Sequence, residues 1–217
     1  MKHILEVDSV QLHFGERRIL SDVYMKCETG SITGLLGRNG QGKSCLLRII
    51  HGSLQAEKSV RFDNISNYYA YKKPDLLLYL PQFNFSPGHL TLHRIFKDFD
   101  IDFEVFIHQF PEFNKFRKAR IKELSGGNRR LIELYVIIKA PSSFAMLDEP
   151  FSHLSPLHID AVKELLIKEK RNKGFLITDH MYKHIVDVSD PLYILVNGKT
   201  HLAKKLEDIE ALGYARL

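Results

Sequence analysis

Tryptophan is absent from this chain of 217 residues, and cysteine occurs only at Cys27 and Cys45. Two thiols in a chain of this length do not make a disulfide framework, so a reducing cytosol is the expected compartment. No apolar run approaches the roughly 18 residues of a membrane helix, so we expect the chain not to span a bilayer itself. Acids near the start, Glu6 and Asp8, argue against a signal peptide.

The chain also has only a small excess of one charge sign. Lysine and arginine total 31 against 26 acids, which gives a net charge of +5. Such a mild basic excess suits a nucleotide, a nucleic acid or an anionic membrane and selects none of them. The densest basic run, residues 115–130, is typical of a solvated helix face. Length and composition are those of one globular domain.

The hydrophobic pattern predicts strands that alternate with helices. Residues 3–14 and 17–28 follow the two-residue period of strands, with a turn between Phe14 and Arg17. Further strands are predicted at residues 31–36, 76–80, 144–147, 174–178 and 191–196, with a short pair within 58–71. Helices are predicted at residues 45–50, 128–139, 156–172 and 181–188. This alternation indicates a largely parallel α/β core.

Residues 83–123 differ from the rest because phenylalanine recurs there at spacings of three and four. The spacing predicts short helices with an aromatic inner face. We interpret the segment as part of an inserted helical subdomain, and part of its aromatic stripe as a possible docking surface. The phenylalanines concerned are Phe96, Phe99, Phe103, Phe106, Phe110, Phe113 and Phe116.

The most informative pattern is the octapeptide at residues 37–44, which matches the phosphate-binding loop G-x-x-x-x-G-K-[ST]. A predicted strand precedes it and a predicted helix follows it, a context that argues against an incidental glycine-rich turn. Glycines let backbone N–H groups face a phosphate, and the helix N-terminus adds unpaired donors. We expect Lys43 to reach the β- and γ-phosphates and Ser44 to ligate Mg²⁺. The residues predicted to hold the nucleotide are Gly37, Arg38, Asn39, Gly40, Gln41, Gly42, Lys43, Ser44 and Cys45.

Two acids, Asp148 and Glu149, follow the apolar run at 144–147. A buried strand delivers such carboxylates to the carboxyl edge of a parallel sheet, where α/β proteins bind ligands. Acids also commonly cap a strand end, but this pair follows a phosphate loop. We therefore predict that Asp148 holds Mg²⁺ and that Glu149 polarises a water molecule for attack on the γ-phosphate.

The stretch Leu124-Ser125-Gly126-Gly127-Asn128 would by itself indicate only the capped start of a helix. Together with the phosphate loop, the acids before Pro150 and Gln82 after an apolar strand, it resembles the ATP-binding cassette (ABC) ATPase family over nearly the whole chain. The resemblance implies an α/β fold with a P-loop NTPase core and a mainly parallel sheet. It also implies an N-terminal antiparallel β subdomain and an inserted α-helical subdomain. Residues 1–217 would form a single ABC ATPase domain, with the helical subdomain at about 83–140.

The resemblance also assigns roles outside the phosphate loop. Phe14 matches the aromatic residue that stacks on adenine, with hairpin packing as the alternative. Gln82 matches the glutamine that senses Mg²⁺ and the attacking water, with an ordinary strand-end glutamine as the alternative. His180 matches the switch histidine that contacts the γ-phosphate. The signature at 125–127 is implied to contact the γ-phosphate bound by the opposite protomer.

Two features depart from the family pattern. Asn128 stands where glutamine is usual, and we expect little loss because serine and glycine amides carry the phosphate contact. The loop usually written Ser-Ala-Leu-Asp reads Ser152-His153-Leu154-Ser155, so its aspartate is missing. In the family that aspartate helps to couple the two sites of a dimer. We therefore expect intact ATP binding with looser coupling.

Two histidine pairs also have a spacing that a metal could use. His180 and His184, like His89 and His93, stand four residues apart. Neither pair has an evident third ligand in the sequence. Exposed or packed histidines are therefore the expected outcome.

The resemblance implies the cytosolic ATPase subunit of an ABC transporter, with ATP and Mg²⁺ as cofactors. Two cassettes, expected to be identical, would close head to tail around two ATP molecules. A separate transmembrane permease subunit would hold the chain at the cytoplasmic face of the membrane, and no nucleic-acid partner is expected.

Two other interpretations stay open from the sequence. One is a non-transport cassette that acts on ribosomes, nucleic acid or an assembly complex, although ribosome-acting members generally carry two cassettes in one chain. The other is a regulatory nucleotide-binding module without turnover. The presence of Glu149 and His180 argues against the second.

Overall fold

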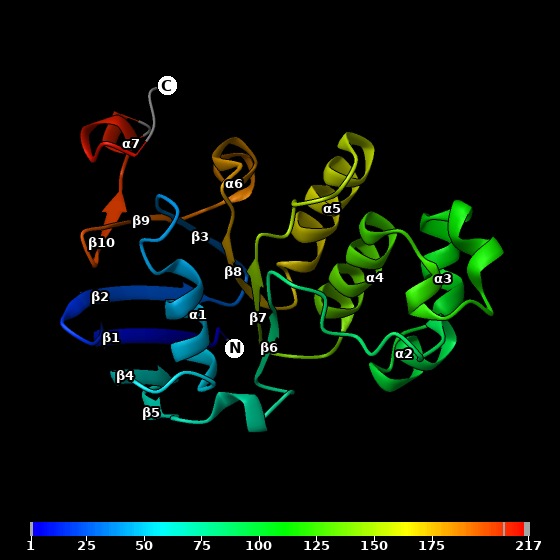
Figure 1. Ribbon diagram of the computed structural model, residues 1–217, viewed down its shortest axis with the longest axis horizontal. Helices are drawn as coiled ribbons and strands as arrows, with labels where there is room; N and C mark the ends of the chain where they lie inside the picture. Colours follow the sequence, from blue (N-terminus) through cyan, green and yellow to red (C-terminus); the bar gives the residue numbers. More distant parts are fainter. Residues whose placement is uncertain (1, 206, 215–217) are drawn as a thin grey trace.

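The computed structural model describes residues 2–205 and 207–214, which build one mixed sheet with helices on both faces (Figure 1). Within these residues, ten strands lie in the order β5-β4-β1-β2-β10-β9-β3-β8-β7-β6. The strands are β1 (Ile4–Phe14), β2 (Arg17–Glu28), β3 (Ile32–Leu36), β4 (Glu57–Phe62), β5 (Ile65–Ser66), β6 (Leu77–Leu80), β7 (Phe144–Asp148), β8 (Gly174–Thr178), β9 (Leu192–Val196) and β10 (Lys199–Ala203). The helices are α1 (Lys43–His51), α2 (Leu92–Asp98), α3 (Phe103–Gln109), α4 (Gly126–Lys139), α5 (Pro156–Glu169), α6 (Tyr182–Val188) and α7 (Glu207–Ala211). Short 3₁₀ helices are η1 (Ala70–Lys72), η2 (Pro111–Phe116) and η3 (Ile121–Glu123).

The N-terminal part of the sheet is antiparallel, as the resemblance implied. β1 and β2 form the predicted hairpin, with Phe14 paired to Arg17 across the turn. The strand pair predicted within 58–71 is shorter than expected. β4 turns into β5 through Asp63 and Asn64, which both have positive φ (51° and 65°), the conformation of a two-residue hairpin turn. The side chain of Asn67 then accepts from the N–H of Tyr69 and bends the chain out of the sheet.

Strands β9, β3, β8, β7 and β6 form the parallel part of the sheet. Every residue of β3, β7 and β8 is buried, which explains their mainly apolar sequences. Leu35 and Met146 pack in the cluster that includes α1, whereas Leu36 and Leu147 face the cluster formed with α4, α5 and α6. Successive residues of these strands therefore anchor helices on opposite faces of the sheet.

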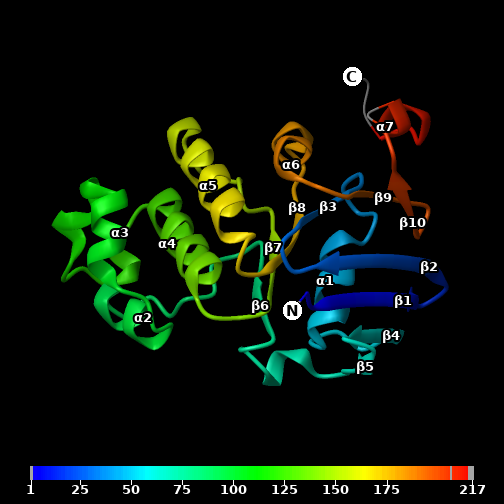
Figure 2. The ribbon, with the colours of Figure 1, turned by 180° about the vertical axis from the view of Figure 1, so that it is seen from behind.

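We refer to residues 83–140 as the helical lobe. Figures 1 and 2 show α2 and α3 at the end of the molecule that is farthest from β1 and β2. The predicted aromatic inner face is confirmed, because the rings of Phe106 and Tyr135 lie 4.8 Å apart between centroids at the centre of a buried cluster. The other buried phenylalanines of the predicted face are Phe96, Phe103, Phe110 and Phe113, while Phe99 and Phe116 are partly buried against them.

Several boundaries differ from the sequence prediction. The helix predicted at 128–139 begins at Gly126, because the Ser125 hydroxyl accepts from the N–H of Asn128 and caps it. The helix predicted at 156–172 ends at Glu169. Strand β10 and helix α7 were not predicted, since β10 lacks a buried residue and shows no apolar alternation. No helix among the described residues is both long enough and apolar enough to cross a membrane.

Candidate active site

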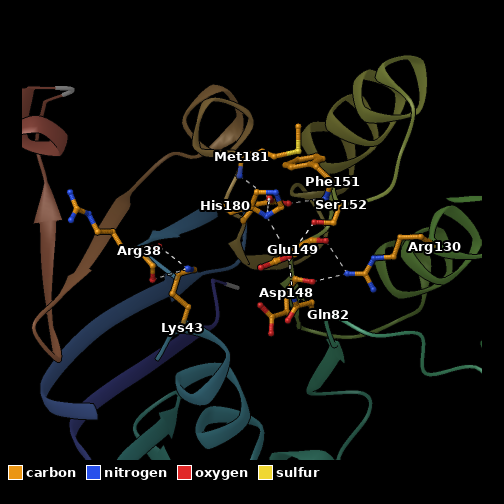
Figure 3. A network of polar contacts seen from close by, with 12 residues as sticks. Arg38, Lys43, Gln82, Arg130, Asp148, Glu149, Phe151, Ser152, His180 and Met181 are labelled. Carbon is orange, nitrogen blue, oxygen red and sulfur yellow. Dashed lines mark hydrogen bonds and ion pairs between the residues drawn. The ribbon is translucent and has the colours of Figure 1, made fainter. Parts of the chain in front are cut away.

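The strand order gathers motifs that lie far apart in the sequence at one edge of the sheet. The phosphate loop follows β3, His180 follows β8, Glu149 follows β7 and Gln82 follows β6. Because these four strands are parallel neighbours, their carboxyl ends meet at the same edge. Figure 3 shows the side chains of Gln82, Glu149 and His180 converging there.

Glycine is required within the phosphate loop for two separate reasons. Gly40 and Gly42 have φ of 81° and 99°, a region that other residues rarely adopt. At Gly42 a Cβ would also lie 2.8 Å from Cγ2 of Ile19. Gly42 is the N-cap of α1, so the unpaired N–H groups of that helix begin directly after it. The loop therefore presents backbone donors in the arrangement that a phosphate needs.

Lys43 is buried beneath this loop with its ammonium group turned back onto it. Its Nζ donates to the carbonyl oxygen of Gly37 at 2.6 Å and to that of Arg38 at 3.4 Å. Burial lowers the pKa of Lys43, and the charges of Glu149 and Asp148 oppose this shift. A largely desolvated cation that is held by carbonyl groups is prepared to exchange them for a phosphate oxygen.

A pocket of about 400 Å³ opens between the phosphate loop and the tip of the β1–β2 hairpin. Its lining residues are Phe14, Arg17, Ile19, Asn39, Gly40, Gly42, Lys43, Ser44, Cys45, Gln82 and Glu149. Phe14 is 54% exposed, so its ring is accessible to a ligand in this pocket. Arg17 and Ile19 were missed by sequence reasoning, although the pairing of Arg17 with Phe14 across the turn was a usable signal.

Asp148 is buried at the end of β7. The hydroxyl of Tyr79 donates to its Oδ2 at 3.1 Å. Burial raises the pKa of Asp148, and the neighbouring hydroxyls of Ser44 and Tyr79 partly offset this. Among the described residues, Oδ1 has no hydrogen-bond partner of good geometry. A buried carboxylate oxygen with an unused lone pair, beside the Ser44 hydroxyl, fits the oxygen ligands that Mg²⁺ prefers.

The carboxylate of Glu149 contacts several other residues of the site. Its Oε2 accepts from Nε2 of Gln82 at 2.9 Å and from Oγ of Ser152 at 3.2 Å, and it lies 3.4 Å from Nδ1 of His180. The backbone of Glu149 is left-handed, with φ of 52°, and its N–H donates to the carbonyl of Thr178 at 2.7 Å. A non-glycine residue adopts this conformation only where its surroundings hold it.

Asp179 connects the ends of β7 and β8 and was missed in the sequence. It is fully buried. Its Oδ2 accepts from the N–H of Phe151 at 3.0 Å, its Oδ1 from the N–H of Met181 at 2.9 Å, and Oδ1 lies 3.3 Å from Nδ1 of His180. The side chain of His180 is half exposed, so Asp179 orients an imidazole that can still reach a ligand. An acid directly after a buried strand was the available signal.

His180 and His184, the members of one predicted pair, have different surroundings. The ring of His184 packs against that of Phe151, with centroids 5.4 Å apart, while the partner in its pair, His180, faces Glu149. In the described part of the chain, no three His, Cys, Asp or Glu side chains are grouped as a metal site. The pair spacing therefore carries no separate metal proposal.

Two of the predicted phosphate-loop side chains point elsewhere. Arg38 and Gln41 line a different cavity, of about 170 Å³, next to the C-terminal residues Leu212 and Tyr214. Oε1 of Gln41 accepts from the N–H of Asn197 at 3.2 Å. Contact between these two loop residues and a nucleotide would therefore use their backbone groups.

The signature residues Ser125, Gly126 and Gly127 do not line the pocket that contains Lys43. Gly126 has open space around it, whereas a Cβ on Gly127 would lie 2.7 Å from the carbonyl oxygen of His153. The signature thus packs against the loop at 152–155, which departs from the family pattern. Within that loop Ser155 caps α5 by accepting from the N–H of His158 at 3.3 Å, a role that an aspartate also fills.

Comparison with known proteins identifies the family of this chain. The family model described as ABC transporter matches residues 20–152. Lipopolysaccharide export system ATP-binding protein LptB of Haemophilus influenzae is 28% identical over 213 residues, which cover 90% of this chain and 88% of that protein. A probable branched-chain amino acid transport ATP-binding protein, LivF of Archaeoglobus fulgidus, is 29% identical over 208 residues, covering 88% of each chain.

Solved structures show the same fold. The ATP-binding subunit of an ABC transporter superposes with a TM-score of 0.80 at 21% identity, covering 97% of this chain and 94% of that one. A nucleotide-free ATP-binding cassette gives a TM-score of 0.78 at 22% identity, covering 98% and 96% of the two chains. The fold is therefore the α/β fold of an ABC cassette, as expected. From the family match and the motifs gathered at the sheet edge, the chain belongs to the ABC transporter family, whose ATP-binding subunits it resembles along its length.

Proposed function

We propose that this chain binds ATP with Mg²⁺ and hydrolyses it, with Glu149 as the general base. The observation that carries the proposal is the position of the Glu149 carboxylate. It lines the same pocket as Lys43 and Ser44, and Gln82 and Ser152 hold one of its oxygens. A carboxylate fixed beside a phosphate-binding loop can take a proton from a water molecule that attacks the γ-phosphate.

Other side chains in and beside the pocket have distinct roles in this reaction. Lys43 exchanges its loop carbonyls for the β- and γ-phosphate oxygens, and the loop amides bind the same groups. Ser44 and Asp148 would hold Mg²⁺, which when bound offsets charge on the phosphate oxygens. Gln82 orients the Glu149 carboxylate, and His180 donates to the γ-phosphate from its place on Asp179. Phe14 stacks on the adenine.

Two copies of the chain would complete each site by closing head to tail. Support comes from residues 125–127, which carry the family signature but do not line the pocket of their own chain. Their backbone donors would bind the γ-phosphate held by the partner. Because that phosphate exists only while ATP is intact, closing and opening follow the nucleotide state.

The dimer would power a transporter whose membrane-spanning subunit is a separate permease. The transport-related names of the matching relatives support this role. The chain would then be cytoplasmic and would meet the membrane only through the permease. Co-purification of a hydrophobic membrane protein with the tagged chain from detergent-solubilised membranes is the expected result. Recovery with ribosomes or a soluble assembly complex instead would contradict it.

A phosphate-release assay tests the enzymatic part of the proposal. Wild-type protein should release phosphate from ATP only when Mg²⁺ is present. Glu149→Gln keeps the size and hydrogen bonding of the side chain but removes its basicity, so it should bind ATP like wild type and lose turnover. Turnover by Glu149→Gln at the wild-type rate would refute the general-base assignment.

A further inference from the structure

Arg130 is a buried cation that the proposed reaction does not use. It lies on α4, shortly after the signature, and only 2% of its surface is exposed. We propose that Arg130 is a positioning residue that fixes the backbone of Glu149 relative to the segment that carries Gln82. The inference rests on the proposed function, because Glu149 and Gln82 take their roles from it.

One guanidinium group joins the ends of two strands. Nη1 of Arg130 donates to the carbonyl of Pro81 at 2.7 Å, directly before Gln82. Nη2 donates to the carbonyl of Asp148 at 2.6 Å and to that of Glu149 at 3.0 Å. Figure 3 shows the side chain reaching from α4 toward the two acids. The planar fork of arginine can bind carbonyls at the ends of β6 and β7 at the same time, which a lysine ammonium cannot reproduce.

These contacts surround a residue whose backbone conformation is unfavourable. Glu149 has left-handed φ, which is costly for a residue with a side chain. Its N–H bonds to the carbonyl of Thr178 on one side and its carbonyl bonds to Arg130 on the other. The two contacts together hold the peptide groups that flank its Cα. They thereby fix the direction in which the carboxylate leaves the backbone toward Gln82 and Ser152.

Burial of the Arg130 guanidinium group is energetically unfavourable. Burial lowers the pKa of Arg130, and its Nε has no hydrogen-bond partner among the described residues. A buried charge that is not fully satisfied contributes little to stability compared with an apolar side chain of the same size. Its three bonds to carbonyl groups at the sheet edge are therefore better explained by positioning than by folding.

The neighbouring Arg129 provides a matched control. It lies on the same helix and also contacts the segment that follows Gln82. Its Nε donates to Oε1 of the buried Glu133 at 3.2 Å, and its Nη2 donates to the carbonyl of Ser86. Neither contact involves the carbonyl groups of Asp148 or Glu149. Arg129→Met thus removes a cation and a link between α4 and the same segment without releasing Glu149.

The test compares Arg130→Met, Arg130→Lys and Arg129→Met with wild type in kcat, KM, ATP affinity and melting temperature. For Arg130→Met we expect kcat to fall about 100-fold, with KM and ATP affinity within about threefold, because a misplaced base slows chemistry more than binding. Arg130→Lys should recover part of the loss, to within about 10-fold of wild type. Arg129→Met should keep kcat within about threefold even if it melts at a lower temperature.

Three results would overturn the inference: wild-type kcat in Arg130→Met, an equal loss of kcat in Arg129→Met, or a rise in KM that accounts for the whole effect. If Arg130→Met does not fold, Arg130→Lys decides on the same measurements. If wild-type protein releases no phosphate, the proposed function fails, and a crystal structure of Arg130→Lys or Arg130→Met then decides the inference. In that structure Glu149 should have left its left-handed conformation and its contact with Gln82, and an unchanged Glu149 would contradict us.

Discussion

The carboxyl edge of the sheet and the signature at residues 125–127 differ in how their polar groups are bonded. At the sheet edge, functional side chains already bond to one another or to the loop, as Gln82 and Ser152 do with Glu149 and as Lys43 does with Gly37. At the signature, the Ser125 hydroxyl caps its own helix, and a Cβ at Gly126 would meet open space beside that helix within the described part of the chain. In the first region, the chain itself supplies hydrogen-bond partners for these side chains. The second offers donors without a ligand in its own chain.

Under the proposed function, this difference explains how one chain can carry a complete set of residues and still need a partner. In the proposed reaction, the sheet edge would supply the base, the cation and the magnesium ligands. The signature supplies only backbone donors at the start of α4, which suit an anion brought from outside. Substitutions in the two regions should therefore separate ATP binding from turnover, and the following four tests run from the largest expected effect to the smallest.

Lys43→Ala should have the largest effect, because it removes the buried cation of the pocket. We expect a loss of about 1,000-fold in kcat/KM, most of it as lost ATP affinity. Arg48→Ala is the matched control, since Arg48 is an exposed cation on the same helix and does not line the pocket. Calorimetric ATP titration of both variants measures the effect. Unchanged ATP affinity in Lys43→Ala would contradict the assignment of Lys43 to phosphate binding.

Gly126→Asp should lower ATP turnover without changing the binding of ATP to the isolated chain. The new side chain meets open space, and an acid at the start of α4 favours the helix, so folding should be kept. Its negative charge would repel the partner's γ-phosphate, and we expect turnover to fall about 100-fold. Gly126→Asn, which has the same size without the charge, should lose less. Equal turnover in wild type and Gly126→Asp would show that the signature does not meet a phosphate.

Phe14→Ala tests the adenine-stacking role on the pocket side. Because this ring is 54% exposed, its removal should leave the melting temperature nearly unchanged. Loss of stacking should weaken ATP binding by about 10-fold, and Phe14→Tyr should restore it. A drop in melting temperature with unchanged ATP affinity would instead support the hairpin-packing alternative.

Ser155 should show the smallest effect, confined to stability. Ser155→Ala removes the cap of α5 and should lower the free energy of unfolding by about 1 kcal/mol, measured by urea denaturation. Ser155→Asp, which restores the residue usual in the family, should keep the cap and the stability. Should Ser155→Asp destabilise the chain as much as Ser155→Ala, the capping role is wrong.

The sequence predicted the site best where each motif is local to one strand end. The phosphate loop, the acids at 148–149, Gln82 and His180 each follow an apolar run, and parallel strands bring such ends together whatever lies between them. The buried phenylalanine face of the helical lobe was also predictable, because periodicity alone marks an inner face.

Residues that act through distant partners were not predictable in the same way. Arg130 is one basic residue in a charged run, and its proposed role depends on carbonyl groups at the ends of β6 and β7 that only the fold brings near. Tyr79 looked like one apolar residue of a strand, yet its hydroxyl bonds Asp148. Gln41 was predicted to hold the nucleotide, but its side chain accepts from the N–H of Asn197, so its backbone would make that contact.

A mixing experiment tests most directly whether the pocket of one copy is completed by the signature of another. Lys43→Ala and Gly126→Asp proteins should each be nearly inactive alone. In a mixed dimer, one site would join an intact pocket from the Gly126→Asp chain to an intact signature from the Lys43→Ala chain. Mixing equal amounts should therefore restore phosphate release to up to about a quarter of the wild-type rate, because half of randomly formed dimers would carry one working site in two. If mixed dimers form, as shown by differently tagged chains, and no activity returns, the composite site is contradicted.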